Sequence, residues 1–205
     1  MYAIAIHGGA GAVPRATLAA ERERNYRAGL EAALDGGYAV LERGGTSLDA
    51  VATAVRLLED HPSFNAGHGA ALTRDGAAEL DAAIMDGSRL RAGAVASVRH
   101  VKNPIELARR VMEKSRHVLL VGAGAEEFAL EEHFSLVPNQ YFRTPERLEQ
   151  LASEQRGERV SDLVPLRPRS RALRAAPGPI RARRVARTRA APAARPCGST
   201  GWGPV

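Results

Sequence analysis

A glycine-rich loop near the start of the chain is the first feature that could do chemistry. The loop His7-Gly8-Gly9-Ala10-Gly11 follows an apolar run at residues 2–6. Glycine permits positive φ angles and a close approach of the backbone to a ligand or to another segment. The loop lacks the endings of the two common phosphate-binding loops, so phosphate binding is the weaker alternative. We expect the loop either to pack beside an active site or to form an ordinary tight turn.

A second loop carries side chains that could bind a metal ion. Asp60, His61 and His68 stand between a predicted helix and a group of short strands, and imidazole is a good zinc ligand. The seven-residue spacing of the two histidines matches no usual pair of zinc ligands, which disfavours a zinc site. Asn65 in the same loop could donate its amide to nearby backbone or close an Asx-turn.

Two carboxylates further along the chain could suggest acid/base catalysis. Asp81 and Asp86 flank a short apolar segment. Asp86 is followed by Gly87, and Asp-Gly is a turn signal. We therefore favour turn residues at strand ends over a catalytic pair.

Two helices are predicted to precede the second loop. Apolar spacing indicates one helix over residues 18–42, although the pair Gly36-Gly37 weakens it by up to ~1 kcal/mol per glycine. Thr46 and Asp49 form a capping-box pattern that begins a second helix ending near Glu59. The expected inner faces are Leu30, Leu34 and Leu41 for the first helix, and Val51, Val55 and Leu58 for the second.

The rest of the ordered pattern alternates strands and helices. Strands are expected at 2–6, 70–73, 78–85, 91–98 and 117–121, and we expect the first and the last of these to be buried. Helices are expected at 104–114 and 125–132, and the second of these has an acidic face that we expect to be solvated. Turn signals at residues 74–76 and 86–88 indicate hairpins. This order predicts an α/β fold in which helices cover a sheet.

Composition divides the chain in two. Residues 165–205 contain 10 of the 29 Lys and Arg residues and none of the 23 Asp and Glu residues. We therefore expect a domain at 1–160 and an Arg/Pro/Ala-rich tail at 161–205 that is disordered or out of frame. Cys197 is the one cysteine, and no signal peptide or membrane span is evident, so a cytoplasmic location is expected.

Several sequence blocks, in order and spacing, resemble the plant-type asparaginase and isoaspartyl peptidase family of N-terminal nucleophile hydrolases. The resemblance covers roughly residues 2–155. Its blocks are Ile4-Ala-Ile-His-Gly-Gly-Ala-Gly-Ala12, Leu57-Leu-Glu-Asp-His-Pro-Ser-Phe-Asn-Ala-Gly-His-Gly69, Thr73-Arg-Asp-Gly76 with Glu79-Leu-Asp-Ala82, Met85-Asp-Gly-Ser88 with Ala92-Gly-Ala-Val95, Asn103-Pro-Ile105 and His117-Val-Leu-Leu-Val-Gly122.

The resemblance implies a fold and an enzyme activity. The implied fold is an αββα sandwich, here incomplete because only the part that resembles the alpha-subunit is present. The implied hydrolase frees a threonine by self-cleavage, and the threonine's own amine then serves as the base for its hydroxyl. The substrates would be the side-chain amide of asparagine or the β-aspartyl bond of an isoaspartyl dipeptide. The implied partners are a beta-subunit and a second alpha/beta unit.

The resemblance also implies roles for residues of the two loops. His7, Gly8, Gly9, Ala10, Gly11 and Asn65 would support the active site. No cofactor would be required. A structural sodium ion would be held by the backbone carbonyls of Leu58, Glu59, His61, Phe64, Ala66 and His68.

The chain departs from the family where the nucleophile should be. No segment after residue 150 matches the threonine block, so we identify no catalytic residue and expect the chain to be inactive alone. The composition after that point suggests a frameshift near residues 155–170, which translation of all three frames of the gene would test.

Two non-enzymatic functions remain as alternatives. One is a nucleic-acid-binding module that uses the basic tail, which we disfavour because Trp202 is its one aromatic residue. The other is a small-ligand binder that uses the glycine loops. The resemblance also implies that strands from the beta-subunit part would complete the sheet. We therefore expect residues 1–160 alone to expose an apolar sheet edge and to aggregate or associate with one another.

Overall fold

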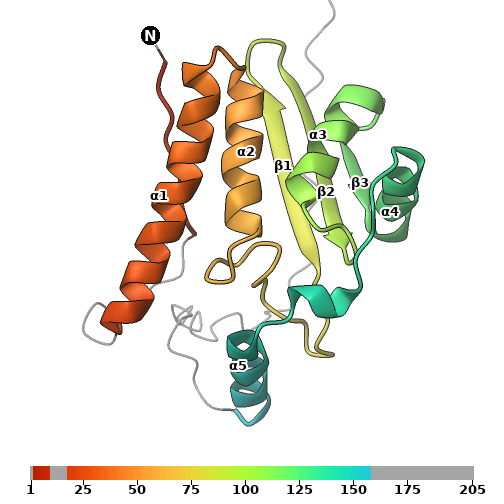
Figure 1. Cartoon of the computed structure of the whole chain (residues 1–205). Helices are drawn as coiled ribbons and strands as arrows, with labels where there is room; N and C mark the ends of the chain where they lie inside the picture. Colours follow the sequence, from red (N-terminus) through yellow and green to blue (C-terminus); the bar gives the residue numbers. More distant parts are fainter. Residues whose placement is uncertain (1, 10–17, 158–205) are drawn as a thin grey trace, which may run out of the picture. The chain divides into compact units, whose positions relative to one another are not determined.

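The computed structural model describes residues 2–9 and 18–157. These residues form a mixed α/β fold of five α-helices, one 3₁₀ helix and a three-stranded sheet (Figure 1). The elements are α1 (Ala20–Glu42), α2 (Ser47–Glu59), β1 (Leu80–Asp86), β2 (Arg91–Val98), α3 (Pro104–Lys114), β3 (Leu119–Val121), α4 (Gly122–Glu131), the 3₁₀ helix η1 (Asn139–Phe142) and α5 (Pro145–Gln155). The expected boundary at residue 160 and the Arg-rich tail lie outside the described residues. Among the described helices, none is both long and apolar enough to cross a bilayer.

The sheet has the order β1-β2-β3, with β1 and β2 antiparallel and β3 parallel to β2. The hairpin turn forms where predicted, and Asp86 Oδ1 accepts hydrogen bonds from Ser88 N and Oγ at 2.9 and 2.7 Å. Asp81 lies inside β1, where its Oδ1 accepts from Ser97 N at 2.8 Å beside an irregularity in the strand pairing. The two carboxylates therefore hold backbone at separate places, and the paired acid/base alternative has no geometric support.

The first hairpin is less regular than the sequence predicts. Within residues 70–73 only Leu72 pairs, in an isolated bridge with Ala78. The turn between them is present, since Gly76 N donates to Thr73 O at 2.9 Å and Gly76 has a φ of 76°. The expected strand at 70–73 is therefore wrong, although the chain does reverse there.

Helix α3 covers one face of the sheet (Figure 1). Gly93 makes this packing possible, because a Cβ at this position would lie 2.2 Å from Ala108 O and 2.4 Å from Met112 N. The core therefore brings the backbone of β2 almost against that of α3. It contains Leu80, Ile84, Val95, Val98, Val101, Ile105, Leu107, Val111, Met112 and Phe142.

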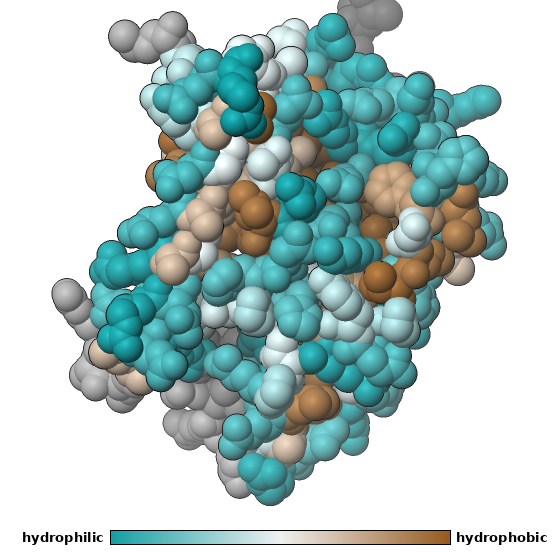
Figure 2. Space-filling model, viewed as in Figure 1, coloured by the Kyte–Doolittle hydropathy of each residue, from teal (hydrophilic) through white to brown (hydrophobic). Residues whose placement is uncertain are grey.

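The opposite face of the sheet has no cover among the described residues. The strand register puts Met85, Leu119 and Val121 on this face, together with several alanines. These three side chains are 58, 51 and 54% exposed. The strand expected to be buried at 117–121 is thus an exposed edge strand, since no described segment pairs with its outer side. By contrast, the helix-covered side seen in Figure 2 is mostly hydrophilic.

Helices α1 and α2 pack mainly through small residues. Of the leucines predicted for α1, Leu30 is partly buried against Ala33, Leu58 and Phe64, and Leu41 is half-buried. Gly29, Ala33 and Gly37 are the buried positions of α1, whereas Leu34 is 36% exposed. A Cβ at Gly37 would lie 3.0 Å from Ala50 O. The glycine that lowers the helix propensity of α1 therefore lets the two helix backbones approach closely.

The inner face of α2 is likewise built from small residues. Ala50, Ala52 and Ala54 are buried with Leu58, whereas Val51 is 38% exposed. Of the three residues predicted for this face, Leu58 is therefore correct, Val55 is partly buried against the core, and Val51 is wrong.

The predicted start signals of the helices have different outcomes. The capping box of α2 is confirmed, with Asp49 N donating to Thr46 Oγ1 and Thr46 N to Asp49 Oδ2. Helix α3 begins at Pro104 as predicted, although Asn103 makes no side-chain cap. In α4 the acidic face is only partly solvated, because Glu126 Oε1 accepts hydrogen bonds from the backbone N–H groups of Arg99 and His100.

Residues 2–9 do not form the buried strand that the sequence predicted. They have no strand partner among the described residues. Ile4 and Ile6 are half-buried, with Ile6 packed against Ala33, Leu58 and Phe64, while the alternate side chains are exposed. A strand requires a neighbouring chain for its hydrogen bonds, and apolar sequence alone does not supply one.

Replacing Gly93 with alanine should destabilise the fold, because the added Cβ would collide with backbone atoms of α3. We expect a loss near the upper end of the ~1–3 kcal/mol usual for overpacking, measured by urea unfolding. Gly87→Ala is the matched control, since its Cβ would meet nothing within 4 Å. Equal stability of the two variants would contradict the close packing of α3 on β2.

Candidate functional site

The loop between α2 and the first hairpin, residues 60–69, is termed the support loop. Its two ends meet where His68 N donates a 2.7 Å hydrogen bond to Glu59 O. Gly67 permits this closure, because it has a φ of 47° and its Cβ would lie 2.4 Å from Glu59 O. The loop is therefore a closed ring of backbone that sits directly on the last residue of α2.

Aromatic packing holds the support loop against α1. The Phe64 ring lies 5.8 Å from Tyr26 and 5.2 Å from His61, measured between ring centroids. Phe64 is 4% exposed and packs with Ala33 and Leu58. This side of the loop is thus fixed mainly by burial of apolar surface.

Hydrogen bonds hold the end of the support loop against η1 and α5. The ring Nδ1 of His68 lies 2.6 Å from Tyr141 O, and Gly69 N donates to Phe142 O at 3.3 Å. Arg147 Nε on α5 donates to Gly69 O at 2.6 Å. These bonds fix the backbone at residues 68 and 69.

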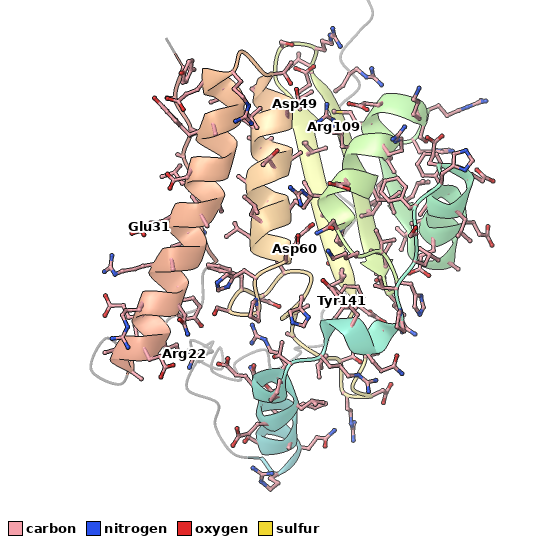
Figure 3. The ribbon with its side chains drawn as sticks, in the orientation of Figure 1. Arg22, Glu31, Asp49, Asp60, Arg109 and Tyr141 are labelled. Carbon is pink, nitrogen blue, oxygen red and sulfur yellow. The ribbon has the colours of Figure 1, made fainter. Side chains whose placement is uncertain are left out.

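Polar side chains hold the start of the support loop against the segment that begins α3. Asp60 accepts a hydrogen bond from Asn103 Nδ2 at 3.1 Å and pairs with Lys102 at 3.3 Å. The Lys102 ammonium also lies 5.8 Å from the Tyr141 ring centroid. Figure 3 shows Asp60 at the lower end of α2 and Tyr141 on η1 below it.

The glycine loop meets the support loop at Phe64. A Cβ at Gly8 would lie 3.1 Å from Phe64 Cε1 and 3.0 Å from Leu30 Cδ2. Gly9 has a φ of 114°, and its N–H donates to His7 Nδ1 at 3.1 Å. Both backbone features expected of these glycines are present, whereas Ala10 and Gly11 lie outside the described residues.

Asn65 does not close the Asx-turn that was one of its two expected roles. Its Oδ1 accepts a 2.7 Å hydrogen bond from Ala71 N, six residues along the chain. This bond holds the C-terminal end of the support loop. It spans six residues, whereas the side chain in an Asx-turn bonds backbone two residues on. The Asn65 amide Nδ2 has no partner among the described residues, so it is available as a donor.

The carbonyls predicted to hold sodium fall into two groups. Those of Leu58, Glu59 and His61 accept backbone hydrogen bonds within the loop. Those of Phe64, Ala66 and His68 accept none from any donor in the described part of the chain. A hard cation prefers oxygen ligands, and the second group has free lone pairs for one. The residues present therefore fit a backbone cation site.

The described part of the chain does not support the alternative of a zinc site. The described residues contain no cluster of three or more His, Cys, Asp or Glu side chains that could hold a metal ion. His61 Nδ1 accepts a hydrogen bond from Ser63 N, and His68 Nδ1 faces Tyr141 O. The two rings therefore have structural partners.

Glu59 is a buried polar residue that the sequence analysis did not single out for its side chain. It is 4% exposed, and its Oε1 accepts a 3.0 Å hydrogen bond from Ile105 N, while Oε2 has no hydrogen-bond partner among the described residues. Burial raises the pKa of the Glu59 carboxyl to about 8, although the Asn103 side chain is near enough to lower this pKa slightly. The signal was available, because Glu59 follows Val55 by four residues and so lies on the same side of α2.

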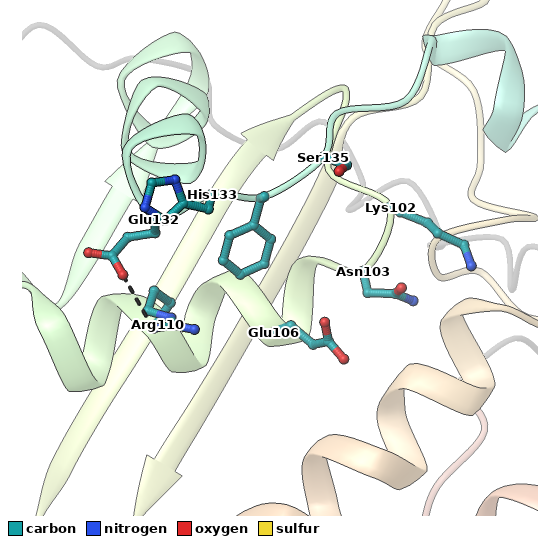
Figure 4. A pocket seen from close by; sticks show the side chains of 8 residues that line it. Lys102, Asn103, Glu106, Arg110, Glu132, His133 and Ser135 are labelled. Atoms are coloured by element: carbon teal, nitrogen blue, oxygen red, sulfur yellow. Dashed lines mark ion pairs between the residues drawn. The ribbon is translucent and has the colours of Figure 1, made fainter.

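Two cavities open beside α3, and the first is lined in part by Lys102 and Asn103, which contact Asp60 of the support loop. The first, of about 360 Å³, opens between α3 and the chain after α4 (Figure 4), and the second, of about 330 Å³, adjoins it. Arg110 pairs there with Glu132 at 3.3 Å, and Glu106 with Arg56 at 3.5 Å. Charges of both signs are paired along these walls, so we do not place the functional site there.

Glu59→Gln should remove a pH dependence of stability. The folded-state pKa of about 8 exceeds the ordinary value of 4.5, so the folded chain holds this proton more tightly. The resulting stabilisation is complete below pH ~4.5 and is lost as pH rises through ~8. The Gln variant should therefore gain stability relative to wild type over that range, by up to ~1.4 kcal/mol per pH unit.

Urea unfolding of both proteins at pH 5, 6.5 and 8 measures this difference, with Glu113→Gln on the exposed side of α3 as the control. A difference in unfolding free energy that stays constant across the three pH values would refute the shifted pKa of Glu59.

Comparison with known proteins places the chain among asparaginases and isoaspartyl peptidases by similarity. The family model described as asparaginase matches residues 1–174. The chain is 52% identical over 160 residues to an isoaspartyl peptidase of Salmonella typhimurium, covering 78% of this chain and 51% of that protein. It is 50% identical over 160 residues to an isoaspartyl peptidase of Escherichia coli, with coverage of 78% and 50%.

A third relative comes from an archaeon. The plant-type L-asparaginase of Pyrococcus abyssi is 52% identical over 129 residues, which are 63% of this chain and 41% of that protein. The chain thus spans about half the length of the curated relatives it matches. On the extent of the family match, the resemblance inferred from the sequence blocks is confirmed, and the chain belongs to the asparaginase family.

Proposed function

We propose that this chain is the alpha-subunit half of an enzyme that hydrolyses asparagine or isoaspartyl peptides. The observation that carries the proposal is the meeting of the glycine loop and the support loop at Phe64, with both loops held by close packing and hydrogen bonds. Residues fixed from several elements are suited to hold a catalytic segment in place. The names of the relatives supply the reaction class.

The proposed chemistry uses a threonine that we do not identify in this chain. Its hydroxyl attacks the side-chain carbonyl carbon of the substrate while its α-amine takes the proton. Ammonia or an amino acid leaves, and water then hydrolyses the acyl-enzyme. The tetrahedral steps require donors that are already aimed at the developing oxyanion.

The described residues would position this chemistry rather than perform it. The backbone of His7, Gly8 and Gly9 would pack beside the threonine segment. The Asn65 amide, whose Oδ1 is already held by Ala71 N, would donate its free N–H to backbone around the nucleophile. Because its acceptor side is engaged, the donor side has a fixed direction.

The uncovered face of the sheet supports the αββα sandwich as the complete fold. Met85, Leu119 and Val121 form an apolar surface there together with alanines. Two sheets pack face to face at about 10 Å when their inner faces are apolar. The second sheet would come from a beta-subunit, and we propose that this chain is inactive without one and that two alpha/beta units assemble.

The non-enzymatic alternatives have less support. A phosphate placed at Gly8 would compete with Leu30 and Phe64, which already occupy the space beside its Cα. The basic tail lies outside the described residues, and the relatives named above are hydrolases by name. We therefore carry neither alternative further.

An activity assay tests the proposed function. The 205-residue chain alone should release no ammonia from asparagine and no aspartate from a β-aspartyl dipeptide. Together with the second half of the Salmonella relative, it should release both. In that mixture Asn65→Ala should lower turnover at least about 10-fold, whereas Glu31→Gln on the exposed side of α1 should not.

Two results would refute parts of this proposal. Ammonia release by the chain alone would show that it is active without a second subunit. Absence of hydrolysis in a mixture that forms a stable complex would refute the assigned reaction.

A structural sodium ion is the second proposal for this site. The free carbonyls of Phe64, Ala66 and His68 would hold it, with those of Leu58, Glu59 and His61 completing the set. The ion would stiffen the support loop and take no part in the reaction. Sodium should then raise the melting temperature above that in choline chloride at equal ionic strength. At a sodium concentration of 100 times the Kd, the unfolding free energy should rise by about 2.7 kcal/mol.

Gly67→Ala should abolish this difference between the two salts, because the residue has a positive φ and faces Glu59 O. Gly87→Ala is the control and should keep it. Equal melting temperatures of the unaltered chain in the two salts would rule out the sodium site.

A further inference from the structure

Glu59 connects three parts of the molecule through a single residue. Its side chain reaches α3, where Oε1 accepts the hydrogen bond from Ile105 N, 46 residues along the chain. Its backbone carbonyl accepts the bond from His68 N that closes the support loop. The end of α2, the first turn of α3 and the base of the loop thus share this residue.

The connection to α3 satisfies a need of that helix. The first N–H groups of a helix have no partner within it and require an outside acceptor. Asn103 makes no side-chain cap, so the Glu59 carboxyl serves as acceptor for one of these N–H groups. Since the carboxyl is 4% exposed, water cannot readily replace it.

The connection to the loop is equally tight. A Cβ at Gly67 would lie 2.9 Å from Glu59 Cβ as well as 2.4 Å from Glu59 O. The loop therefore rests on both the backbone and the first side-chain carbon of Glu59. The atoms that the loop contacts and the carboxyl that reaches Ile105 N thus belong to one residue, so a shift of the Glu59 backbone would change both contacts.

The neighbouring carboxylates have other partners. Asp60 is engaged by Lys102 and Asn103, and Glu106 by Arg56. Glu59 forms no ion pair with a described residue, so its contribution is directional hydrogen bonding in a buried place rather than charge attraction.

We propose that Glu59 is a positioning residue for the active-site loop: its carboxyl ties the base of the support loop to the first turn of α3 and thereby sets the placement of the loop. The inference rests on the proposed function, because the loop matters for catalysis only if it supports the nucleophile. Its structural part can be tested without any catalysis.

Amide hydrogen exchange on the complete 205-residue chain tests the structural part. Glu59→Met removes both oxygens at similar volume, and it should speed exchange of the Ile105, His68 and Gly69 amides at least about 10-fold relative to the β1–β2 ladder amides. Glu59→Gln keeps an acceptor at the Oε1 position and should restore slow exchange. Glu113→Gln, on the same helix as Ile105, is the control and should change none of them.

Glu59→Asp is the milder variant should the Met variant fail to fold. Its carboxyl is one methylene too short to reach Ile105 N, so it should behave as the Met variant does. Equal acceleration of loop and sheet amides would overturn the proposal, because it would show a general loss of stability. Unchanged exchange at His68 and Gly69 would also overturn it.

The catalytic part is tested in the mixture with the second half of a relative. Glu59→Met should lower kcat for asparagine at least about 10-fold while KM changes little, and Glu59→Gln should recover most of kcat. If the Met variant turns over normally although its loop amides exchange fast, Glu59 is not a positioning residue, but the proposed function stands. If neither the variants nor the unaltered mixture hydrolyse asparagine or a β-aspartyl dipeptide, the proposed function fails, and the exchange result stands by itself.

Discussion

The closure of the support loop on Glu59 is the constraint on which the rest of the site depends. One hydrogen bond, from His68 N to Glu59 O, turns ten residues without regular structure into a ring. Within this ring, the carbonyls of Phe64, Ala66 and His68 accept no hydrogen bond from the described part of the chain. Packing of Phe64 and bonds from η1 and α5 then hold the ring in place. The loop thus has the rigidity that a supporting role in catalysis requires.

Close backbone contact at glycine recurs wherever two elements must be brought together. Gly37 lets α2 approach α1 closely, Gly93 lets α3 approach the sheet, and Gly67 lets the loop approach Glu59. Each glycine costs conformational entropy, by roughly 0.5–1 kcal/mol relative to alanine in a regular element. The contact that it allows lies between backbones, which larger side chains could not replace. These three glycines therefore set the distances between the backbones that they bring together.

The described part of the chain has two unlike surfaces. The side with α3 is mostly hydrophilic and carries several ion pairs, such as that of Arg109 with Asp49 (Figure 3). The opposite side of the sheet exposes apolar residues of β1 and β3. Apolar area of this extent on one sheet face is typical of a surface that another layer covers.

Local chemistry in the sequence was enough to predict helices α1 to α4, the β1–β2 hairpin, the capping box of α2 and the family itself, but it did not predict η1 or α5. These depend on neighbouring residues, such as Thr46 with Asp49 or Asp86 with Gly87, and on ordered blocks. Only the tertiary structure decided what is buried: Leu34 is exposed while Gly37 is buried, residues 2–6 have no strand partner, and Asn65 reaches Ala71. The buried side chain of Glu59 shows the reason most clearly. Its partner, Ile105 N, is distant in sequence, and no local pattern specifies which distant backbone group will meet a given side chain.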